Sequence, residues 1–205
     1  LVASPAVASV RSRVFKITGV ANSCSRRIEG SGFLYAPERV MTNAHVVAGV
    51  KNPKVEVDGD DLRATVVLYD PDRDLAVLHV PGLRAKPLAF TGPAKTGQSA
   101  IVVGYPQDGP FRADSARVRG TQSARGPDIY QRKTVVREIY SLRARVRPGN
   151  SGGPLVDTQG NVLGVIFAAA ADDPQTGYAL TAKEAAADAQ KGRTATSAVS
   201  TQRCD

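Results

Sequence analysis

Residues 149–154, with the sequence GNSGGP, form the segment best suited to covalent chemistry. Ser151 has a glycine two residues before it and two glycines directly after it, so the chain can turn tightly and expose the hydroxyl. The glycines also let neighbouring backbone N–H groups point into one hole. Acyl transfer needs a nucleophile beside such donors, because the donors stabilise the oxyanion that develops. Taken alone, a segment of this kind is more often an ordinary turn.

The sequence contains two histidines, and this residue type is the usual general base near neutral pH. His45 follows an apolar, strand-like run, whereas His79 lies inside the apolar run 75–80 and is interpreted as a strand residue. A lone histidine is more often structural than catalytic. His45 therefore needs a partner before a role can be assigned to it.

A carboxylate partner is available in the acidic loop of residues 70–74. Asp74 stands where this loop enters an apolar strand, so its carboxylate can be held away from water and can orient an imidazole through Nδ1–H. Asp70 and Asp72 lie farther from the apolar run, and we expect them to be solvated turn residues. The candidates follow one another along the chain in the order His, Asp, Ser.

The elements around these residues are mostly short β-rich runs between turn residues. Regular short strands separated by turns are typical of a sandwich or a barrel. A Pro- and Gly-rich stretch is expected to connect two all-β halves at residues 81–97. The predicted strands are residues 14–20, 32–35, 40–42, 54–57, 62–69 and 75–80, followed by 99–104, 116–122, 135–146, 154–156, 161–168 and 177–180.

One helix is predicted, late in the chain. Thr181 and Glu184 have the spacing of a capping box, residues 185–191 follow as the helix body, and Gly192 is a stop signal.

The composition excludes several classes of protein. The chain has 205 residues, of which 42% are hydrophobic and 22% are charged, so wholesale disorder is excluded. The longest apolar run, residues 162–171, is well short of the roughly 20 residues that a membrane helix needs. The net charge of +8 is compatible with a basic module that binds nucleic acid or an anionic polymer. However, no basic stripe interleaved with aromatic residues accompanies that charge.

Two cysteines, Cys24 and Cys204, stand near the two ends of the sequence. They form no CxxC motif and have no ligand spacing with the histidines, so neither a metal nor another cofactor is expected. Either they are unrelated buried thiols, or they form one disulfide that joins the end of the chain to its beginning. Such a disulfide is worth roughly 5 kcal/mol in the chain-entropy model and persists only outside the cytosol.

Four segments together resemble the trypsin/chymotrypsin-like serine proteases, and more closely their HtrA-like branch. Each segment is only modestly specific, but four of them in this order and at sensible spacing make a chance match a poor explanation. The segments are residues 30–33 (GSGF), 42–47 (TNAHVV), 74–78 (DLAVL) and 149–155 (GNSGGPL).

The resemblance implies an all-β, chymotrypsin-like fold of two six-stranded antiparallel β-barrels with a C-terminal helix. It also implies a triad in which His45 is the base, Asp74 its orienting partner and Ser151 the nucleophile. The N–H groups of Gly149 and Ser151 would form the oxyanion hole. The parts of one protease domain at 1–205 would be a first barrel at 14–85, a connector at 81–97, a second barrel at 98–180, a helix at 181–192 and a tail at 193–205.

The same resemblance implies that the substrate backbone adds as a strand to Phe167, Ala168 and Ala169. Two departures from the family pattern bear on specificity. Phe167 stands where many relatives carry a serine beside the catalytic aspartate, and Arg145 stands where trypsin carries its specificity acid. Cleavage after Lys or Arg is therefore not expected, whereas a small or medium apolar residue before the scissile bond is.

We accordingly expect an extracytoplasmic serine endopeptidase that cuts protein or peptide substrates, in envelope stress or acid resistance, and has no nucleic-acid partner. The sequence begins at Leu1 without a targeting segment, so such a segment is expected outside it. The resemblance also implies a membrane tether outside this sequence. The domain would then face the periplasm or the extracellular side. Self-cleavage would first be sought before Val14, where the sequence looks flexible. The alternatives are the basic binding module and a protease homologue that binds peptides without cutting them.

Overall fold

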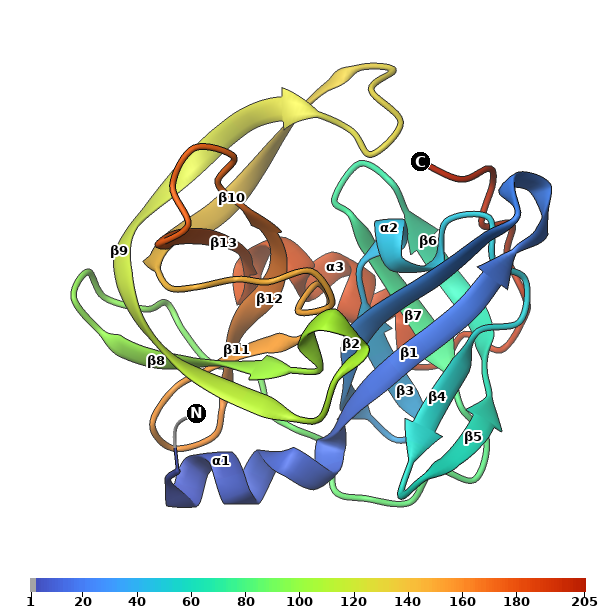
Figure 1. Ribbon diagram of the computed structural model, residues 1–205, viewed down its shortest axis with the longest axis horizontal. Helices are drawn as coiled ribbons and strands as arrows, with labels where there is room; N and C mark the ends of the chain where they lie inside the picture. The colour runs from blue at the N-terminus through green and yellow to red at the C-terminus, as the bar shows by residue number, and fades with distance from the viewer. Residues whose placement is uncertain (1–2) are drawn as a thin grey trace.

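Two β units lie side by side in the computed structural model, which describes residues 3–205 (Figure 1). The N-terminal half of the chain, in blue to teal, forms one unit, and the C-terminal half, in green to dark orange, forms the other. All strand pairings within the named sheets are antiparallel. The predicted fold class, mostly β with a C-terminal helix, is confirmed.

The first unit is a seven-stranded sheet. Its strands are β1 (Val14–Ala21), β2 (Arg26–Ala36), β3 (Arg39–Thr42), β4 (Lys54–Val57), β5 (Asp60–Arg63), β6 (Thr65–Asp70) and β7 (Leu75–His79). Their order in the sheet is β5-β4-β1-β2-β3-β7-β6, and no pairing in the described chain joins the edge strands β5 and β6. This unit is thus an open sheet of seven strands instead of a closed barrel of six. Side chains that include Phe15, Ile17, Leu34 and Leu78 form its core.

The second unit is a closed barrel of six strands, as predicted. Its strands are β8 (Ser99–Gly104), β9 (Arg112–Pro127), β10 (Thr134–Arg143), β11 (Pro154–Val156), β12 (Val162–Ala169) and β13 (Thr176–Thr181). Around the barrel the order is β10-β13-β12-β11-β8-β9. The barrel interior is filled by side chains that include Leu142, Leu155, Leu163 and Ile166. Strands β9 and β10 extend together as the long curved hairpin of Figure 1.

The segment before β1 is helical and packed, which differs from the flexible appearance of its sequence. Helix α1 (Pro5–Val10) begins at Ser4, whose hydroxyl accepts the N–H of Val7 at 3.2 Å. Val7 and Val10 are buried in a core shared by the two units, together with Phe33 of the first and Val162 of the second. The remaining short helical segments are α2 (Ala44–Val47) and the 3₁₀ turns Arg11–Arg13, Asn22–Cys24 and Pro106–Asp108.

Helix α3 (Ala182–Gly192) follows the second unit and packs against strands of both units. The hydroxyl of Thr181 accepts the N–H of Glu184 at 3.1 Å, so the predicted N-cap is present. The carboxylate of Glu184 accepts the N–H of Glu138 at 3.0 Å and leaves the capping box half complete. The hydroxyl of Tyr35 in β2 donates to the carbonyl of Ala189 at 2.9 Å, which attaches the helix to the first sheet.

The residues after α3 cross the first unit and are held there by hydrogen bonds. The N–H of Val199 donates to the carbonyl of Val66 in β6 at 2.9 Å. The N–H of Gly49, just after α2, donates to the carbonyl of Thr201 at 3.0 Å. The end of the chain is therefore part of the packing around the first sheet.

A disulfide joins Cys24 to Cys204, so the second of the two alternatives for the cysteines is confirmed. The two residues are 180 positions apart in the sequence. An ion pair between Arg26 and Asp205, with 3.2 Å between nitrogen and oxygen, lies next to the bond. The C-terminus is thereby fixed to the end of β1 and the start of β2.

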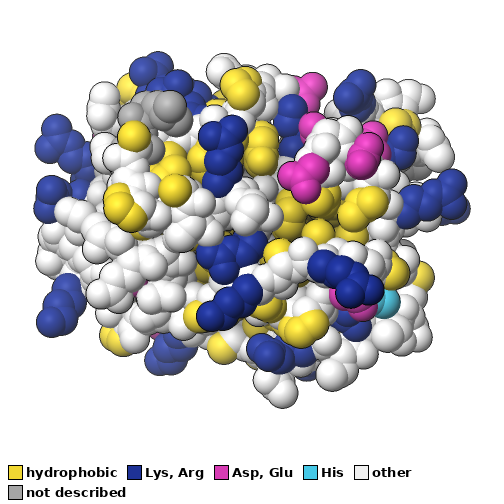
Figure 2. Space-filling model, turned by 90° about the horizontal axis from the view of Figure 1, so that it is seen from below, with side chains coloured by type: hydrophobic (Ala, Val, Ile, Leu, Met, Phe, Trp, Pro, Cys, Tyr) yellow, Lys and Arg dark blue, Asp and Glu magenta, His cyan; other side chains and the backbone are white. Residues whose placement is uncertain are grey.

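The surface reflects the excess of basic residues. On the face shown in Figure 2, Lys and Arg side chains are widely spread, whereas most acidic side chains gather in one part of it. Among residues 3–205, no helix has both the length and the apolar character needed to cross a bilayer.

Candidate active site

His45 and Asp74 form a direct pair at one corner of the first unit. Nδ1 of His45 lies 2.6 Å from Oδ2 of Asp74, and the backbone N–H of His45 donates to Oδ1 at 2.9 Å. The carboxylate thus contacts both the ring and the backbone of His45, and this leaves Nε2 to face a reaction partner. It also serves as the N-terminal cap of α2, where the side chain of Asn43 makes no capping bond.

Backbone geometry and burial hold Asp74 in this position. Its φ of 61° is in the left-handed region, which Asp tolerates better than bulkier residues do. The side-chain amide of Asn43 donates to the carbonyl of Asp74 at 2.8 Å. Because Asp74 is only 4% exposed, its carboxylate has little water to exchange for the contacts with His45.

The pKa of His45 follows from this pair. Burial by itself would lower the pKa of the ring, but the charge of Asp74 and its hydrogen bond outweigh burial. The pKa is therefore raised above its ordinary value of 6.5. A neutral ring that can accept a proton predominates only above this raised pKa.

The turn before Asp74 is held by an ion cluster. Oδ1 of Asp70 accepts the N–H groups of Asp72 and Arg73, each at 3.1 Å. The guanidinium of Arg73 lies 3.2 Å from Asp70 and 3.3 Å from Glu184 of α3. Asp70 is therefore a half-buried member of a cluster, which differs from the solvated turn residue that we expected.

Asp188 of α3 belongs to the same cluster. Its carboxyl is nearly buried, and its Oδ2 has no hydrogen-bond partner within residues 3–205. Burial, and then the neighbouring Asp70, raise the pKa of Asp188 to about 7. Burial would also raise the pKa of Asp70, but hydrogen bonds from Asp188 and Arg73 outweigh it and lower that pKa. The Asp188 carboxyl is thus protonated more readily than that of Asp70.

Ser151 lies on the turn that leads into β11, half-buried and preceded by the loop from β10. The turn depends on two glycines with positive φ, +94° at Gly149 and +87° at Gly152. Other residue types are strained in this region, so the glycines give the turn a conformation that few sequences could adopt.

Hydrogen bonds hold two carbonyl groups of this turn, those of Pro148 and Asn150, on the same side of it. The carbonyl of Pro148 accepts the N–H of Gln107 at 2.7 Å, and that of Asn150 accepts a backbone N–H of the same turn at 2.9 Å. In a trans peptide the N–H points opposite to the C=O, so the N–H groups of Gly149 and Ser151 face the other side. Neither has an acceptor within residues 3–205, which leaves both available to an oxyanion.

Close packing at Gly152 brings the serine turn against the His45 corner. A β-carbon at Gly152 would lie 2.1 Å from the carbonyl oxygen of Ser31 and 2.3 Å from Oγ1 of Thr42. Only glycine allows this approach. Ser31 also donates its backbone N–H to the carbonyl of Ser151 at 2.9 Å. Since Thr42 is three residues before His45, the serine turn of the second unit packs against the segment of the first unit that leads to His45.

Ser31 is a supporting residue to which we assigned no role from the sequence. It is buried in β2, and its hydroxyl donates to the carbonyl of Gly149 at 2.7 Å and accepts the N–H of Tyr105 at 2.9 Å. It thereby fixes the peptide between the two candidate oxyanion donors. The available signal was a serine between two glycines in an apolar run, because a buried hydroxyl requires partners.

The last residues of β12 present an open strand edge. Ala168 and Ala169 pair with β13 on one side. On the other side the last backbone bonds are at Ile166, and no strand of the described chain pairs with the residues after it. Such an edge can accept an extended peptide. The ring of Phe167 is half-buried under the guanidinium of Arg137, which lies 5.9 Å from the ring centre.

Two neighbours in the loop before the serine turn differ in their placement. The side chain of Val146 packs against Gly177 in β13, where a β-carbon would come within 2.4 Å of it. It therefore contributes an apolar surface next to the open edge of β12. Arg145 is exposed and has no hydrogen-bond or ion-pair partner within residues 3–205.

Residues 30–165 match the family described as the trypsin-like peptidase domain. The match covers more than half of the chain and includes His45, Asp74 and Ser151. The chain therefore belongs to the trypsin-like serine peptidase family.

Serine protease Rv3671c of Mycobacterium tuberculosis is 49% identical to this chain over 193 residues. The alignment covers 93% of this chain and 49% of that protein, so the chain spans about half the length of this curated relative. The serine protease Do-like HtrA of Lactococcus lactis is 34% identical over 67% of this chain and 36% of that protein. The expected likeness to HtrA-like proteases is confirmed.

Crystal structures of the Rv3671c protease superimpose on this fold. The active form matches with a TM-score of 0.95 and 48% identity, over 98% of this chain and 89% of that one. The inactive form matches with a TM-score of 0.83 and 48% identity, over 92% of each chain. The described conformation is thus more similar to the active form than to the inactive form.

Proposed function

We propose that this chain is the catalytic domain of a serine endopeptidase that hydrolyses peptide bonds through an acyl-enzyme. The observation that carries the proposal is the 2.6 Å contact between His45 and Asp74 beside a serine turn with two N–H groups that have no acceptor among residues 3–205. A homologue that only binds peptides would have no need to hold a base, its orienting acid and oxyanion donors in this arrangement.

In this mechanism the hydroxyl oxygen of Ser151 forms a bond with the scissile carbonyl carbon while Nε2 of His45 takes the hydroxyl proton. The carbonyl electrons move to its oxygen, which accepts hydrogen bonds from the N–H groups of Gly149 and Ser151. When the peptide C–N bond breaks, His45 returns its proton to the leaving amine. Water then repeats these steps on the ester, and Asp74 stabilises the imidazolium each time.

The substrate would bind as an added strand along Phe167, Ala168 and Ala169, since this edge of β12 is open. Val146 and the two alanines would provide the wall for the residue before the scissile bond. These side chains are small, apolar and uncharged. They favour a small or medium apolar residue there and offer no carboxylate for Lys or Arg.

The domain would work outside the cytosol, on the periplasmic or extracellular side of a membrane, tethered by a segment outside this sequence. The disulfide supports this location, because it requires an oxidising compartment. A relative in Halomonas elongata, 35% identical over 70% of this chain, is described as a probable periplasmic serine endoprotease. In that location the domain would act in envelope stress or acid resistance.

The raised pKa of His45 bears on such a role. Acid protonates the base and slows the reaction, so protection against acid would be indirect. It would come from the earlier cleavage of a protein target and not from faster turnover in acid.

Labelling with a fluorophosphonate probe tests the proposal. The probe reacts with an activated serine, so the unaltered protein should be labelled and Ser151→Ala should not. Ser115→Ala, which removes an exposed serine of the same barrel, is the matched control and should be labelled like the unaltered protein. Equal labelling of Ser151→Ala and the control would refute the proposal.

A further inference from the structure

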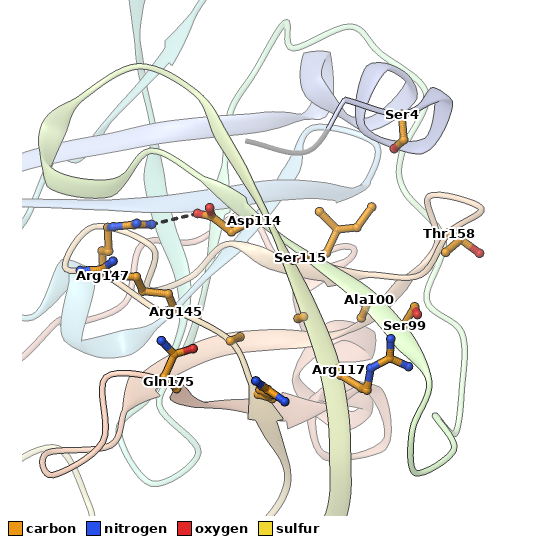
Figure 3. Close-up of a pocket in the computed structure, with 14 residues that line it drawn as sticks. Ser4, Ser99, Ala100, Asp114, Ser115, Arg117, Arg145, Arg147, Thr158 and Gln175 are labelled. Carbon is orange, nitrogen blue, oxygen red and sulfur yellow. Dashed lines mark hydrogen bonds and ion pairs between the residues drawn. The ribbon is translucent and has the colours of Figure 1, made fainter.

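A cavity of about 580 Å³ lies on the second unit, between β8, β9 and the loop that leads to the serine turn. Four arginines line it, Arg117, Arg143, Arg145 and Arg147, against one carboxylate, Asp114. In Figure 3, Arg145 and Arg147 lie together on one side of the cavity and Arg117 on the opposite side. Its volume is in the range of small-molecule sites.

The single carboxylate is already engaged. Asp114 accepts two contacts from Nε of Arg112, at 3.1 and 2.8 Å, and one from Arg147 at 3.0 Å. Burial would raise the pKa of Asp114, but these guanidinium groups outweigh it and lower the pKa. Asp114 therefore stays ionised and bound to its own arginines, and the other guanidinium groups in the cavity are left without a carboxylate.

The remaining arginines differ in how they are held. Arg117 donates to the carbonyl of Gly97 at 2.8 Å, which leaves its positive charge uncompensated. The side chains of Arg143 and Arg145 are exposed and make no hydrogen bond or ion pair within residues 3–205. Like charges gathered around one concave surface repel each other and focus a positive potential into it.

We propose that this cavity is a binding site for a compact anion that carries two or more phosphate or carboxylate groups. The guanidinium fork matches the oxygen spacing of both groups and binds them with two parallel hydrogen bonds. Gln175, which also lines the cavity, offers a further amide donor. A ligand with several charges would reach arginines on both sides of the cavity, whereas a single monovalent ion would not.

Calorimetric titration of the 205-residue protein with inorganic pyrophosphate tests the site. The buffer contains about 0.1 M sodium chloride, which screens nonspecific attraction between the anion and the basic surface. We expect saturable binding of one pyrophosphate per chain. The double variant Arg143→Gln with Arg145→Gln should weaken it by about tenfold or more, because charge-assisted hydrogen bonds are lost. The Ser151→Ala protein should bind equally well, so the result is independent of peptidase activity.

The matched control is Arg63→Gln with Arg84→Gln, which removes the same charge from exposed positions outside the cavity. This control should bind like the unaltered protein. A parallel titration with citrate separates the two ligand classes: binding of both anions assigns a general oxyanion site, and binding of pyrophosphate alone assigns a phosphate site. Absence of saturable binding for both, or equal weakening in the two double variants, would overturn the proposal.

Discussion

The two β units meet at the candidate active site, but the sheet of one is closed and the sheet of the other is open. Every strand of the second unit pairs with two neighbours around the ring, so this barrel is complete without help from other segments. The first unit is open between β5 and β6, and it is covered by segments that come last in the chain. Helix α3 packs against both units, and the hydrogen bond of Val199 to β6 and the disulfide attach the chain end to the first. The half that holds His45 and Asp74 therefore depends on the chain end.

The units also divide the candidate chemistry between them. The first supplies the pair that moves a proton, fixed by burial and by an ion cluster beneath the loop. The second supplies the turn with the nucleophile and the oxyanion donors, fixed by glycine geometry. Changes within either unit, at their contact, or in the segments that close the first should therefore have separable effects.

Asp74→Asn, a substitution within the first unit, should have the largest effect on activity. An amide cannot stabilise the imidazolium and favours the wrong ring tautomer, so kcat should fall by about 10⁴-fold. Stability should change far less, since hydrogen bonds to His45 can persist. Amidase kinetics together with thermal melting would check both. A variant with near-normal kcat would show that the pair does not drive turnover.

The pH dependence of kcat/KM tests the same pair of His45 and Asp74. In the unaltered protein His45 must lose its proton to act, and its pKa is raised by Asp74, so kcat/KM should fall as the pH drops below a midpoint higher than 6.5. The residual activity of Asp74→Asn should have its midpoint at lower pH, because the raising charge is gone. A midpoint that stays in place would contradict our assignment of its cause.

Gly152→Ala tests the contact between the units. Its β-carbon would collide with the carbonyl of Ser31, and its φ is positive, so we expect a loss of about 3 kcal/mol in the free energy of unfolding. Labelling of Ser151 should be lost as well. Gly59→Ala is the control: its φ of +84° is similar, but no atom lies within 4 Å of the added carbon. The control should lose only about 1–2 kcal/mol, and equal losses would argue against the contact.

Replacing both cysteines, Cys24→Ser with Cys204→Ser, tests how far the first unit depends on the chain end. The loss should be about 2–5 kcal/mol. Hydrogen exchange should rise in β1, β2 and residues 193–205, while the closed barrel keeps its protection. Uniform loss of protection in both units would mean that they unfold as one, and identical melting with and without reductant would show that the bond adds no stability.

Asp188→Asn should have the smallest effect, with a sign that depends on pH. Folding raises the pKa of Asp188 from 3.8 to about 7, so ionisation makes the unaltered protein progressively less stable as the pH rises through this window. The amide cannot ionise, so the variant should melt about 3 °C higher at pH 8 and equally at pH 4. Asp172→Asn, at an exposed position, is the control and should not change the difference between the two pH values.

The sequence predicts the parts of this fold that depend on local patterns. Apolar runs between turns indicated the strands. Thr181 marked the start of α3, because an N-cap hydrogen bond joins residues only three positions apart. The open order of the first sheet depends on hydrogen bonds between distant residues, which no local pattern encodes. Helix α1 was missed since its Pro, Ala and Val residues have weak helical periodicity, and its burial comes from both units.

The candidate site shows the same division. His45, Asp74 and Ser151 could be proposed because the short segments that contain them resemble a known protease family in their order and spacing, although none of the three residues is diagnostic alone. Ser31 could not, because its contact with Gly149 crosses 118 residues and the two units. Three of the arginines around the cavity, Arg143, Arg145 and Arg147, alternate in one segment, but Arg117 is distant in the sequence. Only the folded barrel reveals that it faces the other three.

The disulfide also determines what a cut in this protein would do. Cys24 and Cys204 enclose almost the whole chain, so a backbone break in any surface loop between them leaves two fragments covalently joined. Such a nicked molecule would run as one species on a non-reducing gel and separate only after reduction. Only a break before Cys24 detaches an upstream peptide. A single self-cleavage event could therefore release the domain from a preceding segment, but a single cut between the two cysteines could not separate the domain into two molecules.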